Sequence, residues 1–318
     1  MIGGPLLGLL SAFGFGVSDT ITTYAARRIG TFETASLGLL VSSLALGAFV
    51  LVSGLPFSSD PQQLLPAIAL GVVLGIAYVS ITRALRLGPL MVVGPITASG
   101  GAMTVLLSVL VLHDAPSPIQ WAAVPITMLG VALAALVLDR PGGRPFGRGA
   151  LFAGVHAVFL AVYYVGFGRV VDTLGAAQTA FVTRTVSALF AWTLLVFVLG
   201  RRSAARRAEH ASATLQSTAV LPSDAEDSGA PAPRFWSWRP PRRVLGAIFV
   251  GGLVNAASLI VVSYALVLGP TSIVGLLALL SPAVVITAGF VLLRERLSRV
   301  QWLGVLLTAI GAVLATRG

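Results

Sequence analysis

Residues 84–89 read ALRLGP, and residues 265–270, which lie 181 positions later, read ALVLGP. The match continues without gaps, so that residues 84–135 align on residues 265–316 with roughly 17 of about 52 positions identical. An apolar composition alone gives scattered matches but not a Leu-x-Leu-Gly-Pro stretch in register. We conclude that the chain contains a duplication.

The earlier parts of the two copies align at a smaller offset of 145, where Gly30 corresponds to Gly175 and Thr34 to Thr179. The two offsets differ by about 36 residues, which is the length of an insertion in the second copy. We therefore divide the chain into a first repeat over residues 1–138 and a second over residues 149–316.

The composition indicates that lipid surrounds most of the chain. Of the 318 residues 56% are hydrophobic and only 10% are charged, and the mean hydropathy is +0.94, whereas soluble domains are about 25% charged. Ten apolar runs are long enough to cross a bilayer. They lie at about 2–26, 33–53, 66–86, 89–111, 118–138, 149–171, 176–200, 244–268, 270–292 and 300–316. Because open strand edges are not satisfied in hydrocarbon, we predict an all-α integral membrane protein with ten transmembrane helices.

An odd number of helices in each copy places the two copies in opposite orientations, as two inverted five-helix repeats. All 21 basic residues are arginine, and nearly all of them lie in alternate connections between spans, whereas the other side holds only Arg169 and Arg317. The positive-inside rule then places the arginine-rich connections in the cytoplasm and both termini outside. We expect a multi-pass protein of the cell (plasma) membrane.

The longest connection, residues 201–243, is rich in Arg, Ala, Ser and Pro. It buries too little apolar surface to offset its ordering entropy, so we expect a disordered basic loop. Its last part, residues 234–243, alternates Trp with Arg and is typical of an anchor at the lipid headgroups.

Several classes of function lack the residues they need. The net charge of +10 is explained by membrane orientation, so we expect contact with membrane lipid and no nucleic-acid partner. Cysteine is absent, the three histidines are scattered, and the spans contain no acidic cluster. We therefore expect no catalytic residues, no metal site, no cofactor and no enzyme.

Two formally charged residues lie well inside the spans, Asp19 in 2–26 and Arg184 in 176–200. A charge at depth costs at least a few kcal/mol, so each is a functional candidate. At about 1.5 Å per residue they are separated by roughly 8 Å of depth in a core of about 30 Å. Two interpretations remain open: a structural ion pair, or contact with a substrate or coupling proton.

Other polar residues in the spans complete the candidate binding site, which we place near the midplane between the two copies. They are Tyr78, Tyr164, Asn255 and Tyr264. His156 is either a proton relay or a packed histidine with one hydrogen bond. Pro95 and Pro282 are expected to break or kink the spans 89–111 and 270–292.

Small residues recur on one face of the fifth and tenth spans, as Ala123 and Gly130 in one and Gly304 and Gly311 in the other. Such faces allow helices to approach closely. We expect these spans either to pack within one chain or to form the seam of a homodimer, away from the site.

The end of the second copy carries Pro282, the stretch LRERLS at residues 293–298, and then Gln301, Gly304 and Gly311. Asp114, Gln120 and Gly130 take the matching places in the first copy, although Gly101 replaces the proline. Phe15-Gly16 stands where a Trp-Gly pair is frequent, and Arg184 where an arginine is frequent, whereas the first copy has Leu39 there. With these features the chain resembles the EamA-like branch of the drug/metabolite transporter superfamily.

This resemblance covers nearly the whole chain outside residues 201–243. It implies a ten-helix secondary transporter of a small metabolite or drug, working by alternating access between the inverted repeats. Family members are often drawn with cytoplasmic termini, whereas the arginine distribution favours the opposite. The alternatives are a membrane-embedded enzyme and a receptor that binds a small-molecule solute without transporting it.

Overall fold

The computed structural model describes residues 3–55, 57–88, 90–134, 148–219, 240–284 and 299–317. Within these ranges the regular structure is all helical, with no strand. The ten helices there are α1 Gly3–Ile29, α2 Thr31–Ser53, α3 Pro61–Leu87, α4 Leu90–Val111, α5 Pro118–Ala134, α6 Arg148–Leu174, α7 Ala176–Ala219, α8 Arg242–Leu268, α9 Thr271–Ala278 and α11 Arg299–Arg317. Among the described residues, α1, α2, α3, α6, α8 and the first part of α7 are long and apolar enough to cross a membrane, whereas the apolar parts of the other four are shorter.

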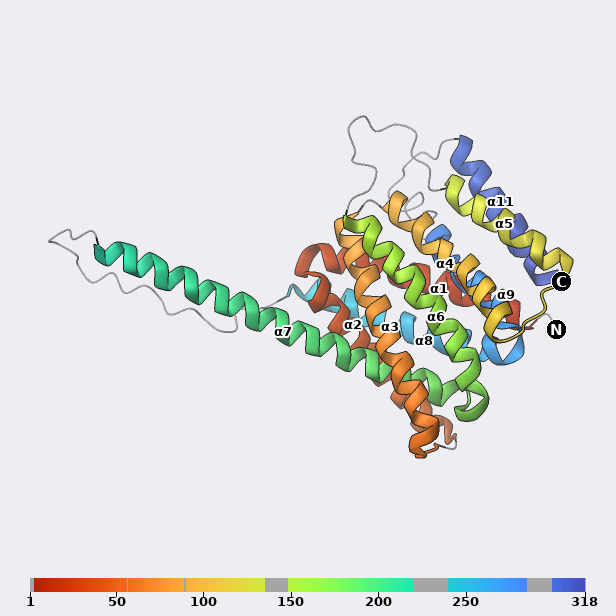
Figure 1. The fold of residues 1–318 in the computed structure, drawn as a ribbon, viewed down its shortest axis with the longest axis horizontal. Coiled ribbons are helices and arrows are strands. Elements are labelled where there is room, and N and C mark those ends of the chain that lie inside the picture. Colours follow the sequence, from red (N-terminus) through yellow and green to blue (C-terminus); the bar gives the residue numbers. More distant parts are fainter. Residues whose placement is uncertain are drawn as a thin grey trace.

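Most helices begin and end close to the expected spans, but α9 is shorter than its expected span and α7 is longer. Residues 201–219 continue α7 as a helix that extends beyond the rest of the bundle (Figure 1). The prediction of disorder from residue 201 onward is therefore wrong for this part. The prediction considered only how little apolar surface this segment buries. The segment contains the helix formers Ala, Arg, Glu and Gln and no Gly or Pro, and it extends a helix that is already nucleated. Residues 220–239, the middle of the expected loop, lie outside the described residues.

Glycines bring the helix ends together in two related places. The start of α1 meets the turn after α8, where a Cβ on Gly4 would lie 2.7 Å from the Gly269 nitrogen. The start of α6 meets the turn after α3 in the same way, with a Cβ on Gly149 at 2.7 Å from the Gly88 Cα. Gly4 and Gly149 are 145 residues apart, and Gly88 and Gly269 are 181 apart. The two contacts therefore join positions that the sequence repeat equates.

The pair α5 and α11 lies side by side at one edge of the bundle (Figure 1). Gly130 of α5 packs against Thr308 of α11, and Gly311 of α11 packs against Thr127 of α5. Each Thr lies three residues before the Gly of its own helix, so the contact is reciprocal. The small-residue faces predicted from the sequence are thus used within the chain. The homodimer through these two helices stays a prediction.

Candidate functional site

A cavity of about 80 Å³ lies inside the bundle. Because one water needs about 10–15 Å³ in this measure, the cavity has room for roughly six water-sized groups. Its described lining comes from α1, α3, α4, α6, α7, α8 and α9, with residues 279, 281 and 282 after α9, and neither α5 nor α11 contributes to it. The lining residues are Phe15, Asp19, Leu74, Ala77, Tyr78, Ile81, Leu85, Val93, Gly94, Thr97, His156, Leu160, Tyr163, Tyr164, Arg184, Asn255, Leu259, Ala278, Leu279, Ser281 and Pro282.

Helical spacing explains how the sequence supplies this wall. On α3 the lining residues are Leu74, Ala77, Tyr78, Ile81 and Leu85, which recur every three or four positions and so form one stripe. On α1, Phe15 and Asp19 are four residues apart and lie one above the other. Phe15, which the sequence reasoning did not select as a site residue, could have been found from this spacing.

The helix that begins at Thr271 is interrupted at the cavity. It ends at Ala278, a turn follows at Leu279 and Leu280, and helical residues resume at Ser281. Pro282 has no N–H, so the Ala278 carbonyl receives no hydrogen bond from it. The break predicted at Pro282 is therefore present. At Pro95 there is no break, because α4 is helical from Leu90 to Val111, and a kink there stays a prediction.

Arg184 of α7 is the largest fully buried side chain among the described residues, with 2% of its surface exposed. Its Nε and Nη1 atoms have no hydrogen-bond partner. The guanidinium carbon lies 5.7 Å from the centre of the Tyr78 ring. The aromatic face offsets part of the cost of burying the cation, but it accepts no conventional hydrogen bond from the N–H groups.

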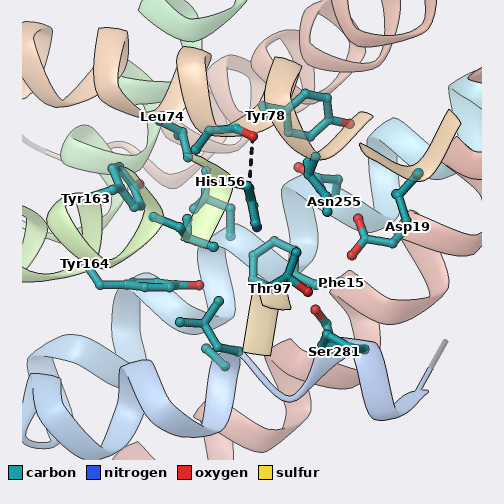
Figure 2. Close-up of a pocket in the computed structure, with 18 of the residues that line it drawn as sticks. Phe15, Asp19, Leu74, Tyr78, Thr97, His156, Tyr163, Tyr164, Asn255 and Ser281 are labelled. Atoms are coloured by element: carbon teal, nitrogen blue, oxygen red, sulfur yellow. Dashed lines mark hydrogen bonds between the residues drawn. The ribbon is translucent and has the colours of Figure 1, made fainter. Parts of the chain in front are cut away.

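Asp19 of α1 lies on another part of the wall, and its carboxylate points into the cavity (Figure 2). Within the described parts of the chain, no side chain makes an ion pair with it, and Arg184 is no exception. The structural ion pair considered from the sequence is therefore not formed. The neighbouring threonines do not serve Asp19 either, since Thr20 and Thr23 donate to carbonyls of their own helix at 2.9 Å and 2.7 Å.

Asn255 of α8 is held by α1. Its Nδ2 donates to the Ser18 hydroxyl at 3.3 Å, and that hydroxyl donates to the Gly251 carbonyl at 3.1 Å. The Asn255 Oδ1 is buried without a partner. Asn255 and Asp19 lie on the same side of the cavity, opposite Tyr163 and Tyr164 (Figure 2).

Two tyrosines and a histidine of α6 form the opposite wall (Figure 2). The Tyr163 hydroxyl lies 3.3 Å from the Thr183 hydroxyl, one residue before Arg184. The Tyr164 hydroxyl points toward the centre of the cavity (Figure 2). The Nδ1 of His156 donates to the Ala77 carbonyl at 2.9 Å, since a carbonyl only accepts. This contact agrees with the interpretation of His156 as a packed histidine with one hydrogen bond.

Five of the six residues selected from the sequence thus line one cavity, namely Asp19, Tyr78, Tyr164, Arg184 and Asn255. Tyr264 does not: it is 36% exposed and lies away from the lining. Its distance from Asn255 along α8 is nine residues, or about two and a half helical turns, which turns it to the opposite face. The prediction of Tyr264 as a site residue did not take into account this rotation relative to Asn255.

The described residues contain no group of three or more His, Asp or Glu that would suit a metal ion. The stretch LRERLS and residues 285–292 of the ninth expected span lie outside the described residues.

Comparison with known proteins places this fold and cavity in a family. The model of the EamA-like transporter family matches residues 2–136 and 228–317, well over half of the chain. A solved structure titled only as a crystal structure of a protein is similar over 98% of this chain and 96% of its own, with a TM-score of 0.68 and 18% sequence identity. That likeness concerns the fold alone. No curated protein matches the chain. The chain is a membrane protein and belongs to the EamA-like transporter family, whose members are transporters.

Proposed function

We propose that this protein is a secondary transporter that carries a small solute across the membrane by exposing its internal cavity to each side in turn. The observation that carries the proposal is the cavity itself, which lies between helices of both halves of the chain and is lined by Asp19 and Arg184, two side chains that form no ion pair among the described residues. A charged side chain inside a membrane span costs free energy as long as nothing pairs with it. Such side chains are therefore typical of a site that binds a ligand. Membership of a transporter family supports the same conclusion.

We further propose ten spans arranged as two inverted repeats. Three structural features that occur in both repeats support this. The first is the contact of Gly149 with Gly88, which recurs as the contact of Gly4 with Gly269. The others are the reciprocal packing of α5 on α11 and the turns at Gly30 and Gly175. Both turn glycines have positive φ, of 115° and 74°. Each donates to the carbonyl four residues earlier and accepts from the amide four residues later. The same local structure thus recurs at the offset of 145.

The orientation is a proposal of the same kind. Helix ends that carry arginine lie together, since the guanidinium of Arg83 at the end of α3 lies over Phe32 of α2 and Phe152 of α6. The end of α1 packs against the start of α8 through Ala25, Val244 and Ile248. We place this end of the bundle in the cytoplasm and the opposite end outside the plasma membrane.

In this arrangement the cavity belongs to the cytoplasmic half. Its lining follows α3 from Leu74 to Leu85, the half nearest the arginine-bearing end. The other end is closed by direct bonds. Asp114 Oδ2 accepts from the Ser272 amide at 2.8 Å, and Gln178 bonds the backbone of Ser58 through both its oxygen and its nitrogen. These contacts would have to separate for the cavity to open outward.

The proposal is tested with the purified protein. A thermal-shift screen against small metabolites identifies ligands, because a ligand that binds only the native state raises the melting temperature. Each ligand is then used in counterflow across proteoliposomes, with protein-free vesicles as the control. Saturable counterflow of a stabilising ligand is the expected result. A ligand that stabilises the protein but gives no flux would make it a receptor instead.

A further inference from the structure

The end of the bundle that we place outside the membrane holds two arginines, Arg169 near the end of α6 and Arg317 at the end of α11. The positive-inside rule disfavours arginine on this side. The duplication does not account for Arg169 either, since the residue 145 positions earlier is Tyr24. Arg169 therefore needs an explanation of its own.

Arg169 bonds the end of a neighbouring helix. Its Nη2 donates to the Val111 carbonyl at 2.7 Å, and Val111 is the last residue of α4. The last carbonyls of a helix have no amide partner within it, and the helix dipole gives this end a partial negative charge. A guanidinium there supplies both a donor and the opposite charge. Arg169 thus caps α4 from α6.

Asp114, which follows α4, caps the start of α9 in a similar way. Its Oδ2 accepts from the Ser272 amide at 2.8 Å, although the two residues are 158 positions apart in the sequence. Pro270, which directly precedes α9, gives this helix no side-chain cap, so the capping carboxylate comes from the other repeat. The start of a helix carries partial positive charge, which the carboxylate offsets.

The connection that carries Asp114 has an unusual backbone. His113 has a φ of 58°, and in the part of the chain that the structure describes it is the one residue other than glycine with a positive φ. A residue with a Cβ adopts this left-handed conformation at a cost in free energy, and it persists where the surrounding structure holds it. The bond from Asp114 to Ser272 is such a restraint on the connection.

Both capped helix ends belong to helices that line the cavity. α4 packs against α6 and α9, and it contributes Val93, Gly94 and Thr97 to the wall. α9 has eight residues and ends at Ala278, which is itself part of the wall. At about 1.5 Å per residue, the start of α9 therefore lies roughly 10 Å from the cavity along its axis. A shift of either helix changes the wall.

We propose that Asp114 and Arg169 form an outer latch, in which the two side chains hold the outer end of the cavity closed by joining the end of α4 to α9 and to α6. Outward opening has to separate these helix ends and exposes the amide of Ser272, a residue that is fully buried in this structure. The inference rests on the proposed function, since it names the residues that hold one of its two conformations.

The test measures access to the cavity from each side. The chain has no cysteine, so Thr97→Cys reports labelling of the cavity by an impermeant thiol reagent. The outer side is the side from which Asp60→Cys is labelled, which makes the test independent of the orientation. We expect Asp114→Ala and Arg169→Gln each to raise outer labelling about fivefold, the ratio that corresponds to one lost helix cap. Labelling from the opposite side should not rise.

Matched variants separate the latch from a general loosening of the protein. Asp60→Ala removes a carboxylate that caps only its own helix, where it accepts from a backbone amide of α3 at 2.9 Å. Arg317→Gln removes the other outer arginine. Both should leave the cavity labelling unchanged. Asp114→Asn keeps an acceptor oxygen and should raise outer labelling less than Asp114→Ala. This variant and Arg169→Gln, a change at an exposed residue, carry the test if Asp114→Ala does not fold.

Unchanged outer labelling in Arg169→Gln and in the folded Asp114 variants overturns the latch. An equal rise from both sides also overturns it, because loosened packing would produce that result. A rise in the variants of only one residue assigns the closure to that residue and overturns the pair.

Counterflow keeps this inference apart from the proposed function. A rise in outer labelling without flux of any ligand that binds supports the latch and overturns transport. Saturable flux with unchanged labelling in the latch variants supports transport and overturns the latch.

Discussion

The guanidinium of Arg184 lies over the ring of Tyr78, 5.7 Å from its centre, with two of its nitrogens unbonded. A cation–π contact contributes about 0.5–2 kcal/mol, which is less than the several kcal/mol that burial of an uncompensated charge costs. Arg184 is therefore present at the expense of stability, which is typical of a residue kept for binding.

It follows that Arg184→Met should not lower the melting temperature of the ligand-free protein, and we expect an unchanged or higher value. Methionine fills a similar volume without an unpaired charge. Arg83→Met is the matched control. Arg83 lies over two rings, Phe32 and Phe152, so its replacement should lower the melting temperature. Thermal unfolding in detergent measures both. A larger loss for Arg184→Met than for Arg83→Met would contradict this account.

Asp19 and Arg184 should behave independently in the ligand-free protein, because no ion pair joins them in the described structure. The stability changes of Asp19→Asn and Arg184→Gln are expected to add within about 0.5 kcal/mol in the double variant. A denaturation cycle of the four proteins gives this coupling. A coupling of more than about 1 kcal/mol would restore the ion pair as a structural element.

The two glycine contacts should control access to the cavity from opposite ends. Gly4→Ala pushes a methyl group against the backbone of Gly269 and should weaken closure of the end that holds the termini, whereas Gly149→Ala acts at Gly88 and should weaken closure of the other end. Overpacking of this kind costs about 1–3 kcal/mol. The chain has no cysteine, so a single Cys at Thr97 in the cavity reports labelling by an impermeant thiol reagent from either side.

Controls for this experiment lie beside the glycines themselves. Gly3 and Gly154 have open space where a Cβ would stand, so Gly3→Ala and Gly154→Ala should leave the labelling rates as they are. If Gly4→Ala and Gly149→Ala change the labelling from the same side, the two contacts do not act as opposite gates.

The α5 and α11 pair should support folding rather than binding. Gly130→Val inserts a branched side chain where Gly130 meets Thr308, and we expect a loss of at least about 1–3 kcal/mol in stability. Leu129→Ala, on the exposed face of the same helix, should have little effect. In the fraction of Gly130→Val that folds, ligand affinity should equal that of the unaltered protein. A loss of affinity without a loss of stability would place α5 at the site.

The helical extension of α7 provides the test of orientation. A single Cys at Ser217 should resist an impermeant thiol reagent in intact cells and react in inside-out vesicles, because the arginine-rich side is expected to be cytoplasmic. A single Cys at Asp60, in the connection between α2 and α3, is the counterpart and should react in intact cells. Labelling of Ser217→Cys from outside would reverse the orientation and place the termini in the cytoplasm.

The sequence by itself determined the helical membrane fold, the order of the helices and the duplication. These follow from local properties: long apolar runs have no other satisfied structure in lipid, and a repeated Gly-Pro turn at a fixed offset needs no tertiary information. It also identified Asp19 and Arg184, because a charge in an apolar run is visible without coordinates.

Only the tertiary structure decided which polar residues share the cavity and whether the two charges meet. Successive residues of a helix are turned by about 100°. Asn255 therefore faces inward and Tyr264 outward, although both are polar residues of the same apolar helix, α8. The rotation of α7 places Arg184 over Tyr78 and leaves its Nε and Nη1 without a partner. The pairing of α5 with α11 packs Gly130 against Thr308 and Gly311 against Thr127. Rotation and partner choice depend on the sum of contacts between helices far apart in the sequence, and no local pattern contains that sum.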